Sequence, residues 1–213
     1  VETDAGKQAR FTDRDFSEAG AQIEQGPDKI YEADIILKIE PPSPEEIDRM
    51  KPKQTLISAL QLRMRDKAYF EALSAKKITA LSFEGIQDES GIAPIVRSMS
   101  EIAGGTSILI AAELMNNLKG GSGRLLGGVS GVPAASVAIL GAGTVGTYAA
   151  KTALGLGAQV MVFDESLSRL RRLQEAVQHP LNTSIMQPSH LRTALGYCDV
   201  AIGAVRSQKG RTP

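Results

Sequence analysis

A glycine-rich turn is the part of this chain whose spacing fits ligand binding best. Gly141, Gly143 and Gly146 follow the pattern G-x-G-x-x-G directly after the apolar run 137–140. The first glycine permits a tight turn, the second lets backbone approach a pyrophosphate, and the third lets the next helix pack against the strand. The phosphates would then meet free N–H groups at a helix N-terminus. We predict a dinucleotide site there, the alternative being a glycine turn that serves packing only.

An acidic residue follows at the distance that such a site requires. A second apolar run, 160–163, ends on Asp164, eighteen residues beyond Gly146. An acid at the end of this strand accepts hydrogen bonds from the ribose hydroxyls of a dinucleotide. Its alternative role is a cap for the helix that follows, and the two roles can coexist.

Composition limits the classes of protein to which the chain can belong. Its 213 residues, 42% hydrophobic and 23% charged, are those of an ordinary globular protein. A formal net charge of zero without a basic run argues against a nucleic-acid partner. No stretch approaches the roughly 20 apolar residues of a membrane span. With a single cysteine, Cys198, and no signal peptide at the N-terminus, we predict a cytoplasmic protein without membrane insertion.

The first hundred residues alternate between predicted strands and helices. Strands are expected at 34–39, 54–57 and 78–83, and a helix at 66–77. Ser43 with Glu46 forms a capping box that opens another helix. This alternation predicts a parallel sheet covered by helices on both faces.

The second half repeats the α/β pattern after a long helix. Ser98 and Glu101 resemble a capping box for a helix over 100–118, and glycines are frequent in 119–131. That segment is either a flexible connection or a hinge. Strands follow at 137–140, 160–164, 183–186 and 200–205. We therefore expect an α/β chain with two Rossmann-like domains, 1–98 and 99–213. Both are expected to be incomplete, as in an internal piece of a longer enzyme.

The chain resembles the alanine dehydrogenase and pyridine-nucleotide transhydrogenase alpha-subunit family. The most specific matches are the helix start Met-Ser-Glu-Ile-Ala-Gly at 99–104 and the loop Leu-Leu-Gly-Gly-Val-Ser-Gly-Val-Pro at 125–133. The resemblance implies a substrate domain followed by an NAD-binding domain, with a cleft between them. It also implies oligomeric assembly, so we expect a homo-oligomer.

The resemblance implies that the cofactor is NAD. Asp164 would repel the 2′-phosphate of NADP, and Arg169 falls where the family often has a basic residue beside the adenosine; for Arg169 we favour a solvated helix face. The residues implied to line the nicotinamide are Ser100, Ala204 and Val205. Those implied to hold the pyrophosphate are Gly141, Ala142, Gly143, Thr144, Val145 and Gly146. No metal ligand is predicted.

The implied catalytic positions depart from the family pattern. The dehydrogenases have a histidine between two leucines where this chain has Gln61, and glutamine cannot exchange a proton at useful pH. Their substrate-binding lysine matches Glu40 without a gap, or Lys38 with a one-residue gap. Gln61 is either a substrate-orienting residue or an ordinary polar residue at a strand end.

Three functions remain open from the sequence. The first is an NAD-dependent oxidation of L-alanine to pyruvate and ammonia, with Gln61 at the histidine position. The second is the NAD-binding subunit of a proton-translocating transhydrogenase, whose substrate is another nicotinamide nucleotide. That chemistry needs no base in the first domain, so Gln61 is no obstacle. The third is a non-catalytic NAD-binding module.

Overall fold

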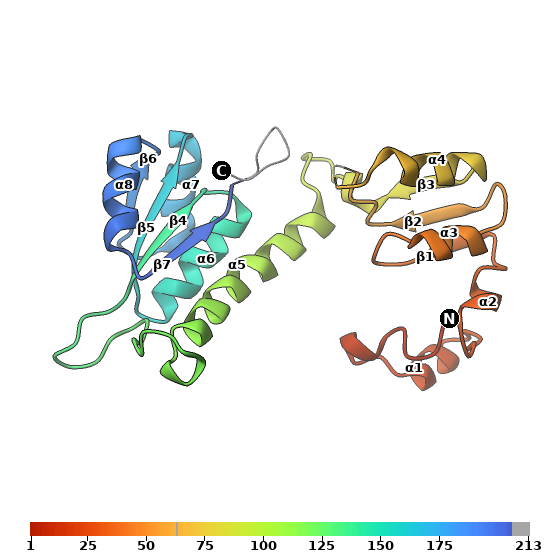
Figure 1. Ribbon diagram of the computed structural model, residues 1–213, viewed down its shortest axis with the longest axis horizontal. Helices are drawn as coiled ribbons and strands as arrows, with labels where there is room; N and C mark the ends of the chain where they lie inside the picture. Colours follow the sequence, from red (N-terminus) through yellow and green to blue (C-terminus); the bar gives the residue numbers. More distant parts are fainter. Residues whose placement is uncertain (63, 206–213) are drawn as a thin grey trace. The chain divides into compact units, whose positions relative to one another are not determined.

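The chain folds into two compact units, each built on its own parallel sheet. The computed structural model describes residues 1–62 and 64–205. One unit comprises Val1–Ala93 and the other begins at Pro94 (Figure 1). None of the helices among the described residues could span a membrane.

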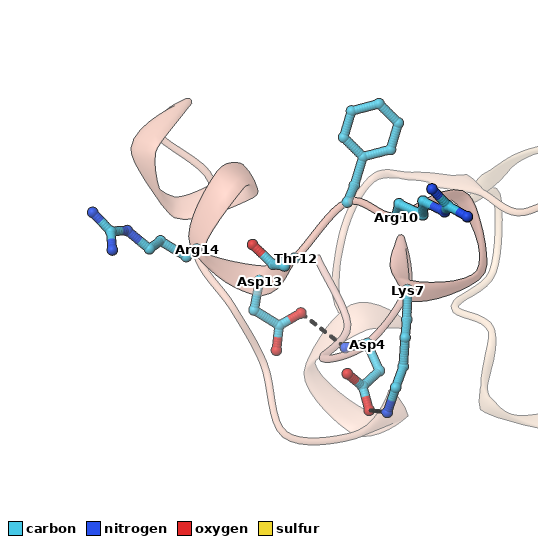
Figure 2. Close-up of a pocket in the computed structure, with 7 residues that line it drawn as sticks. Asp4, Lys7, Arg10, Thr12, Asp13 and Arg14 are labelled. Atoms are coloured by element: carbon cyan, nitrogen blue, oxygen red, sulfur yellow. Dashed lines mark hydrogen bonds and ion pairs between the residues drawn. The ribbon is translucent and has the colours of Figure 1, made fainter.

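The first unit opens with short helical turns. They are η1 (Lys7–Ala9), α1 (Asp13–Glu18) and α2 (Pro27–Ile30). Residues of η1 and α1 line a shallow surface depression, as Figure 2 shows. The Asp13 carboxylate accepts the Asp4 N–H at 2.8 Å, and Asp4 pairs with Lys7 at 3.0 Å. These carboxylates therefore serve to hold the segment together.

The first sheet has three parallel strands in the order β1-β2-β3. The capping box predicted at Ser43 and Glu46 is confirmed, because Ser43 Oγ accepts the Glu46 N–H and Glu46 accepts the Ser43 N–H. Asp66 caps the second helix by accepting the Tyr69 N–H at 3.0 Å. The elements are β1 (Ile35–Leu37), α3 (Pro44–Arg49), β2 (Thr55–Ser58), α4 (Lys67–Ala75), β3 (Thr79–Ser82) and η2 (Phe83–Gly85).

Only one face of this sheet is covered, so the expectation of helices on both faces is wrong for the described residues. The covered face carries Ile36 and Leu56, which pack with residues of α3 and α4. On the opposite face Ile35, Leu37 and Leu81 are 59%, 74% and 51% exposed. The strand order explains this, because two successive right-handed crossovers in one direction place both helices on the same side.

The second unit is a four-stranded parallel sheet in the order β6-β5-β4-β7. The order reverses at β4, since β5 and β6 are added on one side of it and β7 on the other. This is the doubly wound arrangement, with its switch point between β4 and β7. Its core includes Val137, Ile139 and Val162. The elements are β4 (Ser136–Leu140), α6 (Thr144–Gly155), β5 (Gln159–Asp164), α7 (Leu167–Val177), β6 (Asn182–Ile185), α8 (Pro188–Tyr197) and β7 (Val200–Gly203).

The long helix α5 (Pro94–Leu114) begins earlier than the sequence suggested. Ser98 lies inside it and donates its hydroxyl to the Pro94 carbonyl, so the predicted cap at Ser98 and Glu101 is wrong. The helix packs against α6 (Figure 1). The two helices approach closely at Gly104, where an added Cβ would lie 2.4 Å from the Val145 carbonyl oxygen. Any side chain at position 104 would therefore push the two helices apart.

The glycine-rich segment after α5 is partly packed into the second unit. It contains η3 (Asn117–Lys119) and continues to a turn at 127–132. Leu126 is buried, and a Cβ on Gly127 would lie 2.5 Å from the Leu156 carbonyl oxygen. Gly127 is thus a contact residue against the end of α6.

Candidate functional site

The glycine turn lies at the switch point of the second sheet. Gly141 has φ +113°, and a Cβ there would lie 2.5 Å from the Ala204 carbonyl oxygen just after β7. A Cβ on Gly146 would lie 1.8 Å from the Gly141 carbonyl oxygen. Both positions therefore require glycine for the turn to form, as the spacing predicted.

The middle glycine serves a different purpose. Gly143 is the N-cap of α6 and has no side chain with which to cap this helix end. A Cβ on Gly143 would meet no heavy atom within 4 Å. Folding therefore does not require glycine at this position. Open space above the uncapped N–H groups of Thr144 and Val145 fits the approach of a pyrophosphate.

Asp164 is bonded to the glycine turn, a contact that the sequence did not reveal. It is 4% exposed at the end of β5, and its Oδ2 accepts the Ala142 N–H at 2.7 Å. Its Oδ1 accepts the Ser166 N–H at 2.8 Å, while Ser166 itself is the N-cap of α7. A carboxylate has about four lone-pair positions, so two hydrogen bonds leave capacity for ribose hydroxyls.

Arg169 lies close to this acid. Its Nη1 is 3.9 Å from Asp164 Oδ2, and its side chain is 57% exposed. The guanidinium is thus largely solvated and lies beside the carboxylate, and a contact with the adenosine stays a prediction.

The residues expected around the nicotinamide come from α5 and from the end of β7. The Ala204 N–H donates to the Leu140 carbonyl at 2.7 Å, which places Ala204 and Val205 beside the glycine turn. Ser100 lies one turn before Gly104 and donates its hydroxyl to the Val96 carbonyl at 2.8 Å. It is therefore on the part of α5 that approaches the first turn of α6.

In the first unit, Lys38 and Gln61 follow neighbouring strands at the same edge of the sheet. Lys38 comes directly after β1, and Gln61 comes three residues after β2. The Ala59 N–H donates to the Ile39 carbonyl at 3.1 Å, so the two segments stay joined beyond the strands. Ligands of open parallel sheets bind at this carboxyl edge.

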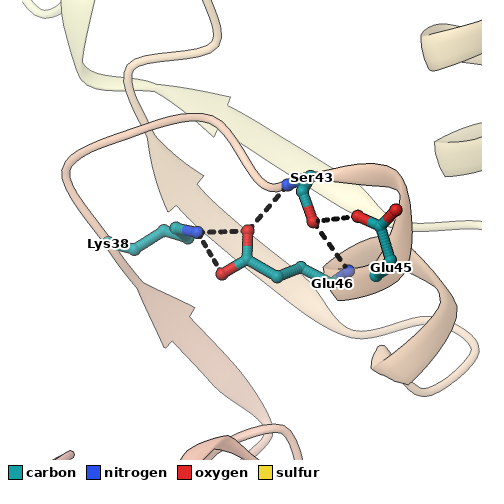
Figure 3. Close-up of polar contacts among 4 residues, drawn as sticks. All are labelled: Lys38, Ser43, Glu45 and Glu46. Carbon is teal, nitrogen blue, oxygen red and sulfur yellow. Dashed lines mark hydrogen bonds and ion pairs between the residues drawn. The ribbon is translucent and has the colours of Figure 1, made fainter.

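Lys38 is held in an ion pair with the helix that follows. Its Nζ donates to both carboxylate oxygens of Glu46 (Figure 3), and each N–O distance is 2.5 Å. Burial disfavours the ionised form of Glu46, but hydrogen bonds from Lys38, the Ser43 N–H and Tyr31 outweigh this and lower its pKa. Burial and the Glu46 hydrogen bond raise the pKa of Tyr31. Lys38 thus has a structural partner.

Gln61 is fixed by two contacts, one with a residue after β3 and one within its own loop. It adopts φ +50°, and its backbone N–H donates to Glu84 Oε2 at 2.8 Å. Its side-chain Oε1 accepts a hydrogen bond from Arg65 Nη2 at 3.3 Å. Sequence reasoning missed both partners. Their positions in the sequence could have indicated them. Glu84 follows β3 and Arg65 precedes the cap of α4, so both lie at the same carboxyl edge of the sheet as Gln61.

The Lys38–Glu46 pair predicts a pH dependence of stability. Because the pKa of Glu46 is lowered on folding, its contribution is complete above the unfolded value of about 4.3 and is lost as pH falls through the folded value. We expect Glu46→Gln to be less stable than the native chain at neutral pH, with the difference shrinking below about pH 4. Thermal midpoints against pH measure this. Glu71→Gln, beside Lys67 on the surface, is the control. A constant difference down to pH 3 would contradict the assignment.

These features define a doubly wound α/β protein with a glycine-rich turn at its switch point. Two family descriptions match the chain: the N-terminal domain of alanine dehydrogenase/PNT over residues 1–103 and its C-terminal domain over residues 107–213. The chain therefore belongs to the alanine dehydrogenase/PNT family, whose members bind pyridine nucleotides.

Individual relatives agree with this assignment. Alanine dehydrogenase 2 of Staphylococcus aureus and alanine dehydrogenase of Staphylococcus epidermidis are each 36% identical over all 213 residues. The chain spans 57% of the length of these relatives. A solved L-alanine dehydrogenase superposes with a TM-score of 0.88 at 36% identity, over 96% of this chain and 56% of that one. A transhydrogenase from Sinorhizobium meliloti shares the fold, with a TM-score of 0.80 at 22% identity. The match covers 100% of this chain and 62% of that one.

Proposed function

We propose that this chain provides the substrate-binding and NAD-binding parts of an amino-acid dehydrogenase that resembles the alanine dehydrogenases. The reaction is the oxidation of L-alanine with water and NAD to pyruvate, ammonia and NADH. The observation that carries the proposal is 36% identity with alanine dehydrogenases over the whole chain. Self-association stays a prediction from the resemblance, and a cytoplasmic location stays a prediction from the single cysteine and the N-terminal sequence.

The second unit is proposed to hold NAD. The N–H groups of Thr144 and Val145 at the start of α6 bind the pyrophosphate, and Asp164 accepts from the adenosine ribose. Gly143 leaves the space for the phosphates, and the fixed Asp164–Ala142 hydrogen bond sets the shape of the turn before ligand arrives. When bound, the nicotinamide supplies the hydride acceptor. Ser100, Ala204 and Val205 are proposed to lie on its side.

The first unit is proposed to bind the amino acid at the carboxyl edge of its sheet. Gln61 orients the substrate by hydrogen bonding, since its amide cannot take up the proton released when the amine is oxidised. Lys38, held by Glu46, is proposed to contribute a positive charge at this edge. Proton transfer then requires a group other than Gln61.

The test is a survey of the full-length protein with NAD and a panel of L-amino acids, following NADH formation. We expect turnover with L-alanine above that with the other amino acids, and preference for NAD over NADP. Reactions without amino acid are the control. Binding of NAD without reduction by any amino acid would overturn the dehydrogenase proposal.

A histidine at position 61 is expected to increase this turnover. General acid–base catalysis contributes about 10²–10⁴-fold, and the pKa of histidine is close to neutral. The left-handed backbone at φ +50° is no obstacle, because histidine adopts this conformation more often than most residues. We expect Gln61→His to raise kcat by about 10²-fold and to give a pH profile with a new inflection near neutrality. Gln61→Asn, which retains an amide, is the control. An unchanged profile in both variants would show that position 61 takes no part in proton transfer.

A transhydrogenase subunit is the second candidate. Gln61 favours it, because hydride transfer between two nicotinamides needs no proton-transfer residue at this position. Hydride transfer from NADH to a second nicotinamide nucleotide, measured in the absence of amino acids, would support this function over the dehydrogenase. NAD binding without either reaction would identify a non-catalytic module.

A further inference from the structure

We propose that Arg65 and the side-chain amide of Gln61 form a carboxylate-binding site at the carboxyl edge of the first sheet. The ligand is the carboxylate of a small 2-oxo or 2-amino acid. This ligand class rests on the proposed function, whereas the site itself is inferred from the contacts of these two side chains.

The guanidinium of Arg65 is incompletely paired. Among residues 1–62 and 64–205 its Nε is buried without a hydrogen-bond partner, and Arg65 forms no ion pair with a carboxylate. Its Nη2 donates to Gln61 Oε1 at 3.3 Å, and its Cζ lies 5.3 Å from the centre of the Tyr69 ring. A partly buried guanidinium without a counter-ion is costly, which favours an anionic ligand.

Arg65 also determines how the Gln61 amide is oriented. A guanidinium has only donors, so the amide must turn its oxygen towards Arg65. The two N–H groups of Gln61 Nε2 are then left to donate elsewhere. Gln61 and Arg65 together therefore offer hydrogen-bond donors and a positive charge, which are the groups that bind a carboxylate.

The surroundings hold both residues in place. The Gln61 backbone N–H is bonded to Glu84, which also accepts the Ser82 hydroxyl at 3.1 Å. Two further buried polar atoms, Ser58 Oγ and Tyr69 Oη, have no partner among the described residues and come from the end of β2 and from α4. Lys38 donates to both carboxylate oxygens of Glu46, whereas Arg65 has no carboxylate partner among the described residues, so Arg65 is the better placed cation for an incoming anion.

Two substitutions test the site, one at each of its two residues. Gln61→Glu keeps an oxygen towards Arg65 but adds a negative charge and removes the outward donors, whereas Arg65→Gln removes the cation. Hydrogen bonds to charged groups are worth about 1.5–3 kcal/mol, so we expect each variant to bind pyruvate roughly 10- to 100-fold more weakly. The affinity for NADH should be unchanged. Titration calorimetry of the full-length protein with pyruvate, with and without NADH, measures both.

The controls separate carboxylate binding from general charge. Arg14→Gln removes an exposed arginine of the same unit, paired with Glu18, and should bind pyruvate like the native protein. Pyruvamide, which lacks the charge, should bind the native protein at least about 10-fold more weakly than pyruvate and be insensitive to Arg65→Gln. Thermal midpoints establish that the variants are folded. If Arg65→Gln does not fold, Gln61→Glu, which retains Arg65, still tests the site.

The outcomes distinguish this inference from the proposed function. Native affinity for pyruvate in folded Gln61→Glu and Arg65→Gln, or no pyruvate binding by the native protein, overturns the site. If pyruvate binding depends on Arg65 but no amino acid reduces NAD, the site is supported and the dehydrogenase proposal is overturned. If alanine oxidation is insensitive to both substitutions, the proposed function is supported and the carboxylate site is overturned.

Discussion

Alanine at position 146 is expected to destabilise the second unit by about 3 kcal/mol, the upper end of the usual cost of overpacking, and to abolish measurable NAD binding. A Cβ at this position would lie 1.8 Å from the Gly141 carbonyl oxygen and 2.9 Å from the Gly141 carbonyl carbon. These are backbone atoms in a turn whose φ of +113° is already restricted to glycine. The strand and helix can only move apart, which changes the positions of the N–H groups at the start of α6.

Gly143→Ala is the matched variant for this experiment. Because a Cβ there meets no heavy atom within 4 Å, the unfolding free energy should change little. The same Cβ would project into the space through which a pyrophosphate approaches, so NAD affinity should fall. Chemical denaturation and NAD titration of both variants measure these effects. Equal loss of stability in the two variants would contradict the packing argument, and unchanged NAD affinity in Gly143→Ala would contradict the proposed phosphate position.

Asparagine at position 164 is expected to reduce both stability and cofactor selectivity. The Asp164 carboxylate accepts from the Ala142 and Ser166 N–H groups, but an amide can offer its oxygen to only one of them. The other N–H, buried at Ala142 or part-buried at Ser166, loses its partner, at a cost of up to about 1–3 kcal/mol. NAD loses a charged acceptor, so its affinity should fall by roughly 10- to 100-fold.

The affinity for NADP should fall less, because the asparagine no longer repels a 2′-phosphate. Titration of the Asp164→Asn variant with NAD and NADP gives the ratio of the two dissociation constants. Glu165→Gln, at the exposed neighbouring acid, controls for a general change in charge. An unchanged ratio in Asp164→Asn would show that this acid does not bind the ribose hydroxyls and only stabilises the glycine turn.

Local signals predicted well what is determined by neighbouring residues. The capping box of Ser43 and Glu46 and the glycine turn each depend on a few consecutive positions, and both formed as expected. Two local signals competed at the start of α5, where Pro94 and the Ser98–Glu101 pair both resemble a first turn. The helix begins at the proline, whose fixed φ suits that position, and Ser98 then bonds back to its carbonyl.

Contacts between distant segments could not be predicted from the sequence. Asp164 and Ala142 meet only because β5 pairs beside β4, and Lys38 meets Glu46 only because α3 folds back over the sheet. The hydrogen bond from Arg65 to Gln61 requires the turn after β2 and a left-handed residue within it. The covering of the first sheet on one face likewise follows from strand order, which the pattern of apolar residues does not encode.

The strand order of the second sheet also has a consequence for the sequence of folding events. Val137 of β4 pairs with Val160 of β5, which is near in the chain, and with Val200 of β7, which is far away. Closing the longer loop costs more entropy, so β4, α6 and β5 are expected to assemble before β7 docks. Gly141 contacts Ala204, which follows β7. The glycine turn at 141–146 is therefore expected to acquire its final shape among the last steps of folding.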